Sequence, residues 1–443
     1  MAIHTPGSSC LDKGKERYVC PLYAALAMGS HEAAKVLLSP IVQSFPASHE
    51  VRRRFDELLS RKEPWPAFPR DSKFHKEGEL HRQMLKSSEE LALLFLSAGL
   101  LRETNALSLF ECAAHERREL FAIGFWKSAN TDQIESWPCT PLHIAAREGL
   151  LDVTSFLLET LNDVDARDKK GRAPLSYAAT SNSKGVAKLL LDTSKADVNA
   201  RDEKVDTGIV DVDARDVEGR SPLSHAITGD SMYTEGNINA VIKLLLASGK
   251  ADINSCNKEG RTPLIWASYT FVKRSELKSI METLLGSGAE FNSRDKEGCT
   301  SLIYAAKSND AWAVDILLKS GADVDSQDKH GRTPLSWAAG SSHKYNFGMD
   351  VIATIRVLGK GKAEINARDD LGRTPLSWAA TAEISSEADT SLWLLEHGAD
   401  PAITDLHGRT AYDHFNLFAQ DHTDQTKLDH LQTEDIRAML WPS

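Results

Sequence analysis

The main pattern along the chain is a polar loop that runs into a short apolar helix. The string GRTPLSWAA occupies residues 331–339 and returns unchanged at 372–380. Its glycine suits a tight turn, its threonine can cap a helix with a side-chain oxygen, and its proline fits the first helical position. Leu335 and Ala338 share one helix face because they are three residues apart. The string therefore predicts a helix that begins at Pro334 and packs an apolar face against its neighbours.

Weaker copies of this pattern begin at residues 140, 173, 221, 262, 300 and 410, and another begins at residue 20. The copies are counted from the threonine position, which is Thr333 and Thr374 in the two exact copies. From residue 140 the successive starts are then separated by 33, 48, 41, 38, 33, 41 and 36 residues. A second apolar stretch such as VAKLLL follows in each clear copy, and then a segment such as GADVDSQD. A base period of 33 residues with insertions is the signature of stacked repeats. The sequence therefore predicts one elongated array of paired helices.

The T-P-L-x-x-A-A start, the period and the GADVDSQD-like segments together resemble the ankyrin repeat. The resemblance implies an all-α solenoid of about eight to ten repeats, each with two antiparallel helices and a β-turn finger. It covers about 140–410 and 20–38 and is poor within 41–139. The Ser-Trp version of the motif is similar to ankyrin arrays of filamentous fungi. The family usually has a histidine after T-P-L that ties neighbouring loops together. Here only His143 keeps it, so this network is in question, whereas the fold is not.

We expect three regions: a divergent N-terminal helical region at 1–139, the repeat array at 140–409 and C-terminal capping helices at 410–443. An insertion at 41–87 interrupts the first region, either as a cap on the stack or as a docking arm. Polar or aromatic loops lengthen four repeats between their two helices, either as tolerated insertions or as a contact rim. The near-copies DVNARD and DVDARD, at 197–202 and 211–216, predict that 203–216 is a duplicated finger that projects as an exposed loop.

Charge and composition exclude some function classes. The chain has 443 residues and a net charge of −11, with +2 in residues 1–90 and −13 in the remainder. A non-specific nucleic-acid binder normally carries a basic surplus, so we expect no nucleic-acid partner. The apolar stretch at 91–101 is too short to span a bilayer, and the N-terminus lacks the apolar core of a secretory signal. Six scattered cysteines indicate reduced thiols. We therefore expect a monomer without a membrane partner, in the cytoplasm or the nucleus.

The sequence contains no motif with catalytic spacing. It lacks a P-loop, a G-x-G-x-x-G loop, an H-E-x-x-H pair and a G-x-S-x-G elbow. His422, Asp424, Asp429 and His430 could be drawn as a metal cluster, but a polar helix end explains them better. We predict no catalytic residue, no metal site and no cofactor.

The repeated D-x-x-G-R-T motif places arginines at one structural position, and these are Arg172, Arg220, Arg261, Arg332, Arg373 and Arg409. Aspartates stand four residues earlier, namely Asp168, Asp216, Asp295, Asp328, Asp369 and Asp405. One interpretation is an arginine comb for an acidic ligand. The favoured one is pairing of arginine with aspartate between neighbouring fingers. A column of aromatic residues precedes the alanines, comprising Tyr177, Trp266, Tyr304, Trp337 and Trp378. It is either a stacking platform or, as we favour, part of the core.

The finger tips vary most between repeats. In ankyrin proteins the tips and first helices line the concave groove that grips partners. The resemblance therefore implies a non-enzymatic scaffold or adaptor that binds another protein along that face. The candidate partner-binding residues are Lys169, Lys170, Arg172, Glu218, Arg220, Lys258, Arg261, Lys296, Lys329, His330, Arg332, Asp370 and Arg373. The alternative is an enzyme or small-molecule-binding protein whose pocket combines the groove, the inserted loops and 41–139.

Overall fold

The structure is a computed structural model, and it describes residues 106–115, 117–119, 122–123, 139–161, 163–193, 210–229, 238–269, 274–340, 351–381 and 387–421. The predicted insertion at 41–87, the early copy at 20–38 and the histidine–aspartate group at 422–430 lie outside these ranges. All regular elements within the ranges are α-helices. The described residues fall into two units that divide between Val164 and Asp165, and each unit is considered by itself.

The first unit contains α6 (Ala106–His115), α8 (Pro141–Glu148) and α9 (Leu151–Thr160). Helix α8 packs against both α6 and α9. His143 caps its own helix, because its Nδ1 accepts a hydrogen bond from the backbone N–H of Thr140 at 3.1 Å. The one histidine that keeps the family position therefore closes the first turn of α8.

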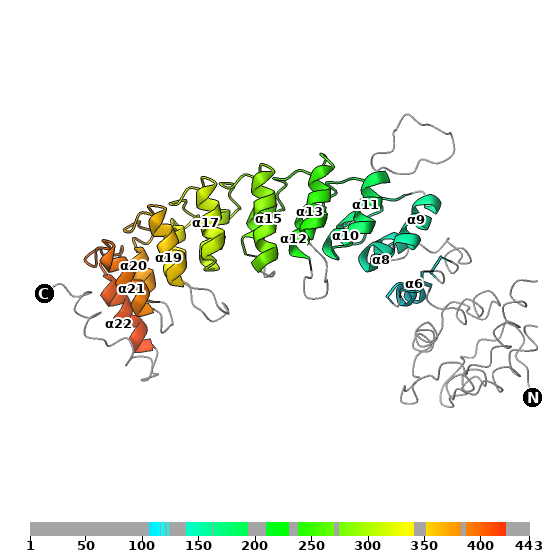
Figure 1. Cartoon of the computed structure of the whole chain (residues 1–443). Coiled ribbons are helices and arrows are strands. Elements are labelled where there is room, and N and C mark those ends of the chain that lie inside the picture. Colours follow the sequence, from blue (N-terminus) through cyan, green and yellow to red (C-terminus); the bar gives the residue numbers. More distant parts are fainter. Residues whose placement is uncertain are drawn as a thin grey trace, which may run out of the picture. The chain divides into compact units, whose positions relative to one another are not determined.

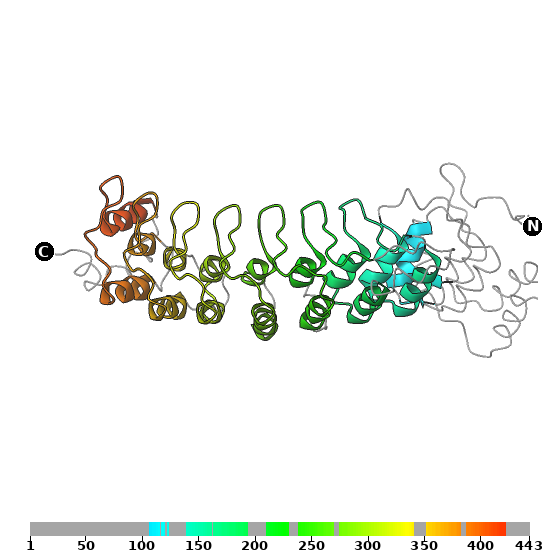
Figure 2. The ribbon, with the colours of Figure 1, turned by 90° about the horizontal axis from the view of Figure 1, so that it is seen from above.

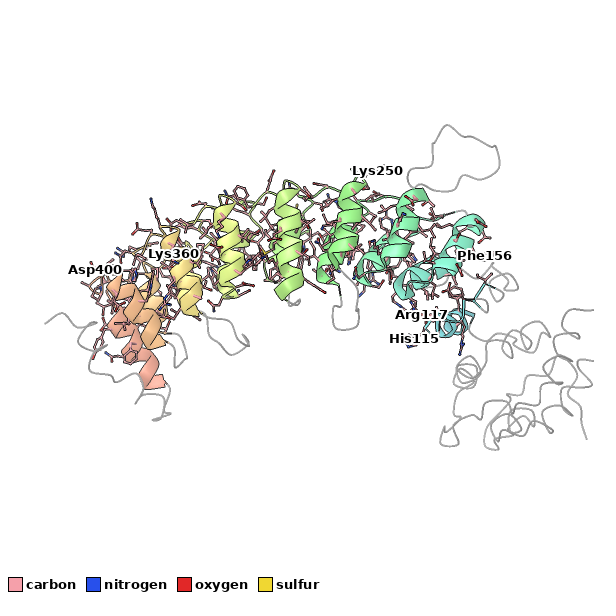
Figure 3. The ribbon with its side chains drawn as sticks, viewed as in Figure 1. His115, Arg117, Phe156, Lys250, Lys360 and Asp400 are labelled. Carbon is pink, nitrogen blue, oxygen red and sulfur yellow. The ribbon has the colours of Figure 1, made fainter. Side chains whose placement is uncertain are left out.

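The second unit consists of helix pairs stacked in chain order (Figure 1). The inner helices are α10 (Pro174–Thr180), α12 (Pro222–Thr228), α14 (Pro263–Ala267), α16 (Ser301–Lys307), α18 (Pro334–Ala339), α20 (Pro375–Ala379) and α22 (Ala411–Asp421). The outer helices are α11 (Lys184–Thr193), α13 (Ile238–Ala247), α15 (Arg274–Gly286), α17 (Ala311–Lys319), α19 (Val351–Lys360) and α21 (Glu387–Glu396). Figure 2 shows the two rows of helices, with the fingers extending from the inner row.

The inner helices begin as their sequence predicts. Thr333 has an extended backbone, and its side-chain oxygen accepts a hydrogen bond from the N–H of Ser336 at 3.3 Å. Pro334 is the first helical residue, where its missing N–H leaves no bond unmade. Leu335 and Ala338 are fully buried against the neighbouring helices. The apolar face inferred from the repeated string is therefore the core of the array.

Asparagine and aspartate side chains tie neighbouring repeats together where the family uses histidine. The side-chain oxygen of one repeat accepts a hydrogen bond from a backbone N–H of the next, 31 to 39 residues later. These bonds join Asn254 to Glu290, Asn292 to Asp323, Asp325 to Glu364 and Asn366 to Asp400, at 2.8 to 3.0 Å. Serine at the histidine position is therefore compatible with tied loops, because another position supplies the bond.

The predicted duplicated finger needs a correction. Residues 211–216, the second near-copy, form the finger that precedes α12, with Val212 and Ala214 buried. Asp211 forms an ion pair with Arg167 of the preceding finger, with 3.4 Å between Oδ2 and Nη2. This part of 203–216 is packed and does not project as a loop. Residues 194–209, which include the first near-copy, lie outside the described residues.

Candidate interaction surface on the fingers and inner helices

Each finger ends in a turn of five residues, D-x-x-G-R or a close variant, which we call the finger turn. The turns span 168–172, 216–220, 257–261, 295–299, 328–332, 369–373 and 405–409. In Asp328, for example, Oδ1 accepts the backbone N–H groups of His330 and Arg332 at 2.8 and 3.0 Å. The same two bonds recur in every turn, with Asn257 as the acceptor in one of them. The first residue thereby folds the turn around its own carboxylate or amide.

Consecutive finger turns are joined by one backbone hydrogen bond each, between the second tip residue of one turn and the first of the next. The pairs are Lys170 with Val217, Glu218 with Lys258, Glu259 with Lys296, Glu297 with Lys329, His330 with Asp370 and Leu371 with Leu406, at 2.8 to 3.0 Å. The glycine of the turn permits this approach. Gly298 has φ +77°, and a Cβ there would lie 2.7 Å from the backbone nitrogen of Lys329. The tips therefore form a continuous edge with fixed spacing.

The side chains at these tips point into solvent. Nearly all of the predicted tip residues are exposed, including Lys169, Lys170, Glu218, Lys258, Lys296, Lys329, His330 and Asp370. Exposed apolar side chains join them at Val217, Leu371 and Leu406. Leu371 and Leu406 follow one another along the edge, since their backbones are hydrogen-bonded at 2.9 Å. Neither leucine is among the candidate partner-binding residues predicted from the sequence, although both occupy tip positions.

The arginines of the finger turns are partly buried, and several pair with aspartate as favoured. The pairs of Arg172 with Asp168, Arg220 with Asp216 and Arg409 with Asp405 have N···O distances of 2.8 to 3.1 Å. These pairs form within one finger turn, whereas we expected pairs between neighbours. Arg261 alone follows the expectation, at 3.6 Å from Asp295 of the next turn, because its own turn has the neutral Asn257.

Arg332 and Arg373 behave differently. Their finger aspartates accept hydrogen bonds from tryptophan instead, since Trp337 Nε1 donates to Asp328 and Trp378 Nε1 donates to Asp369, both at 2.9 Å. The guanidinium of Arg332 lies over both indole rings, 3.7 Å from each centroid. The guanidinium of Arg373 lies 4.9 Å from the centroid of Trp378. These two repeats therefore replace an ion pair by cation–π contacts.

The aromatic column is not part of the buried core. All five of its members are half-buried, and most have a polar group that reaches the finger aspartate nine residues earlier. His225 and His414 occupy the same column and contact Asp216 and Asp405 at 3.1 and 3.0 Å. The expectation of core packing is wrong here, because four of the five rings donate a hydrogen bond to the buried carboxylate of their finger.

The pKa values of some groups on this surface, such as Asp216, Asp405 and Arg332, are shifted from their ordinary values. Burial would raise the pKa of Asp216, but hydrogen bonds from His225 and from the backbone of Arg220 outweigh it and hold the pKa below its usual range. The pKa of Asp405 is lowered in the same way by its bonds to Arg409 and His407. Burial lowers the pKa of Arg332 to about 10, although Asp328 and Asp369 oppose the shift. Arg332 is thus a desolvated cation.

Other site classes find no support in the described part of the chain. Its histidine, cysteine, aspartate and glutamate side chains form no group of three that could hold a metal ion. None of its helices is both long and apolar enough to cross a membrane. The inserted loops at 230–237, 270–273, 341–350 and 382–386, on which the predicted pocket depended, lie outside the described residues.

Comparison with known proteins identifies the repeats. A family model described as ankyrin repeats (3 copies) matches residues 109–202 and 271–348. Over 129 residues, or 29% of this chain, the sequence is 26% identical to Neurogenic locus notch homolog protein 1 of Xenopus laevis and 30% identical to that of Mus musculus. Notch homolog protein 2 of Homo sapiens is 30% identical over 127 residues. The chain spans only 4% of the length of these relatives.

Among solved structures, the ankyrin repeat domain of Bcl-3, a unique member of the IkappaB protein family, is similar to this chain. The identity is 23%, the TM-score is 0.43, and the match covers 57% of this chain and 97% of that one. The paired helices, the fingers and the matched family model agree with the resemblance read from the sequence. The chain therefore contains ankyrin repeats, and its described residues form the all-α solenoid fold of such repeats.

Proposed function

We propose that the array is a non-enzymatic adaptor that binds another protein along the face formed by the fingers and inner helices, the concave face expected from the sequence. Ankyrin repeats generally mediate protein–protein interaction, and this is the coarse function that the comparisons support. The observation that carries the finer proposal is the contrast within each finger. The frame of aspartate, glycine and backbone bonds repeats almost unchanged, whereas the exposed tips differ from turn to turn.

Such an edge is suited to binding because it is already ordered. Loops held by two side-chain bonds and one inter-finger bond lose little conformational entropy when a partner docks. The tips carry both charges, and Lys329 pairs with Glu297 at 2.5 Å across two fingers. An exposed pair of this kind is worth only ~0–1 kcal/mol, so a partner can replace it at small cost. We infer a partner surface of mixed charge with an apolar spot opposite Leu371 and Leu406.

Charge reversal at the tips tests this function. The full chain is used to isolate partners from an extract of its source organism, and each partner is then titrated against variants. Lys258, Lys296 and Lys329 changed together to glutamate should weaken binding by roughly tenfold or more, because rim charges still act on association. The matched control reverses Lys184, Lys188 and Lys243, which are exposed on outer helices. It should change affinity less than about twofold. Equal losses in both variants, or none in either, would move the site away from the fingers.

A further inference from the structure

In the fingers that have both the aspartate and the arginine, the ring residue beside the finger sets the state of that arginine. Where the ring is tyrosine, as at residue 177, Asp168 Oδ2 accepts from both the Tyr177 hydroxyl and Arg172 Nε, each at 2.8 Å. Where the ring is a tryptophan beside such an aspartate, as at residues 337 and 378, the indole N–H donates to the aspartate and the arginine lies over the indole face. The arginine is neutralised in the first arrangement and left without an ion pair in the second.

Two arginines and one lysine that contact Trp337 or Trp378 have no ion pair within the described part of the chain. Among the described residues, Arg332, Arg373 and Lys307 have no carboxylate oxygen within ion-pair distance, 4.0 Å. They lie in one alternating stack of Lys307, Trp337, Arg332, Trp378 and Arg373, which we call the Arg–Trp strip. The Nε atoms of both arginines are buried without a hydrogen-bond partner, and Arg332 Nη2 reaches only the backbone oxygen of Ser336, at 3.1 Å.

Such cations favour an external acceptor. A guanidinium that is partly removed from water and lacks a partner carries an unmet desolvation cost. A carboxylate offers two oxygens that match the planar N–H fork of arginine. The stack fixes both forks before any ligand arrives, so little side-chain entropy is lost on binding. Because both guanidiniums contact the indole of Trp378, the spacing between them is fixed, which suits a ligand with more than one carboxylate.

We propose that the Arg–Trp strip is a recognition site for an acidic peptide segment of the partner, whose glutamate or aspartate side chains pair with Arg332 and Arg373. This inference rests on the proposed function and narrows the partner. Nucleic acid is the less favoured ligand, since the indole faces that bases would need are covered by the strip's own cations.

The test uses the full chain and a fluorescein-labelled decapeptide of glutamate, followed by fluorescence anisotropy at several salt concentrations. We expect salt-sensitive binding that falls by roughly tenfold or more in Arg332→Gln/Arg373→Gln, the loss expected for charge-assisted hydrogen bonds. The matched control, Arg172→Gln/Arg220→Gln, removes two arginines that are already paired within their fingers. It should leave affinity for the peptide within about twofold.

A second variant separates binding from structure. Trp337→Tyr/Trp378→Tyr keeps both arginines but installs the ring that pairs Arg172 with its aspartate. We expect it to fold, to restore the arginine–aspartate pairs and to lose the peptide as strongly as the arginine variant does. A purely structural stack would lower the melting temperature without changing peptide affinity. The proposal is overturned if the wild-type chain does not bind the peptide or if all variants bind it with equal affinity. It is also overturned if an oligo-dT strand binds the wild-type chain more tightly than the peptide does.

Failure of the narrower proposal can be told from failure of the proposed function. If partner binding is lost on reversal of the tip lysines but unaffected in the Arg332 and Arg373 variants, the array still binds protein and the strip is not its acidic-peptide site. If neither set of variants changes partner binding, the finger face is not the binding surface and both proposals fail.

Discussion

At the residue scale, one buried carboxylate organises each finger turn except 257–261, in which the amide of Asn257 takes its place. Asp216 accepts two backbone N–H groups with Oδ1, at 2.9 Å each, and contacts Arg220 and His225 with Oδ2, at 3.1 Å each. Its side chain is only 1% exposed, and all of its acceptor capacity is used by donors inside the fold. Burial is tolerated because every lone pair is satisfied by a donor and the charge is balanced.

Substitution of this carboxylate should give a pH-dependent loss of stability. Asp216→Asn keeps the backbone acceptor, as Asn257 does naturally at 2.9 and 3.0 Å, but removes the charge. Because the folded pKa of Asp216 lies below its unfolded value of about 3.9, the ionised group stabilises the fold fully above pH 4. We expect a cost of roughly 1–3 kcal/mol at pH 7 that shrinks as the pH falls below about 4. Thermal melts of both proteins from pH 7 to 3 measure it, and a gap that does not change with pH would contradict the assignment.

The packing of the inner helices gives a second prediction at this scale. Leu335 is fully buried between helices, and its truncation leaves a cavity that the helical backbone cannot close. Leu335→Ala should cost ~2–5 kcal/mol in a urea titration. An exposed leucine, Leu406, provides the control, and Leu406→Ala should stay within about 0.5 kcal/mol. Similar costs at the two positions would mean that Leu335 is not a core residue.

The sequence was informative about some residues and not about others. Thr333, Pro334 and Leu335 were predictable because their roles depend on local backbone and on periodicity. The partner of Arg332 was not, since it depends on which ring stands five residues later. A signal was nevertheless present, because arginine and tryptophan occur together in both copies of GRTPLSWAA. The Asn292 side-chain bond was also unforeseen, since it joins positions 31 residues apart.

At the element scale, the finger before α12 differs from the projecting loop predicted for residues 203–216. Of the two near-copies, the second forms the finger, and Val210 occupies the buried position that alanine fills in other repeats, as Ala322 and Ala363 show. The length of a connection has little effect on stability so long as its ends meet correctly. Sequence repetition predicted the duplication, but it could not say which copy packs, because both have the same pattern of apolar residues.

Deletion of residues 197–210 should therefore yield a stable array. It joins Ala196 to Asp211 and leaves KADVDARDVEGRSPL, in which 15 residues separate Leu191 from Ser221, as 247–261 and 359–373 do elsewhere. We expect the melting temperature to change by no more than about 4 °C, since no described packing contact except that of Val210 is removed. The control deletes 203–216, which removes Val212 and Ala214 but restores an equivalent finger from the first near-copy. Collapse of both deletions would show that residues 203–210, which both of them remove, are required by the fold.

At the scale of the whole molecule, stability depends on contacts between neighbouring repeats. Inner helices pack on inner helices, finger turns bond to finger turns, and side-chain amides reach the next repeat. In such an array each repeat is stabilised mainly by the two beside it, so one weak interface affects the cooperativity of the second unit. The period predicted this arrangement. The individual interface bonds were not predictable, because they depend on the distance between fingers in three dimensions.

A glycine at one interface provides the test. Gly298 and Gly408 occupy the same place in their finger turns, with φ +77° and +74°, but an added Cβ would lie 2.7 Å from Lys329 N at the first and within 4 Å of no described atom at the second. Alanine should cost ~1–2 kcal/mol at either site through left-handed strain. Gly298→Ala should cost a further ~1–3 kcal/mol because it overpacks against the next finger.

The two variants should also differ in how the unit unfolds. Gly298→Ala should weaken the contact between the finger turns 295–299 and 328–332. Hydrogen exchange should then become faster in α16 and α18, which follow these two turns, while α10 and α12 keep their protection. Gly408→Ala should speed exchange only near α22, at the last described finger. If both substitutions cost the same in urea and change exchange equally, then the close approach of the fingers contributes nothing to stability. The inter-finger edge would then be a consequence of helix stacking and not one of its causes.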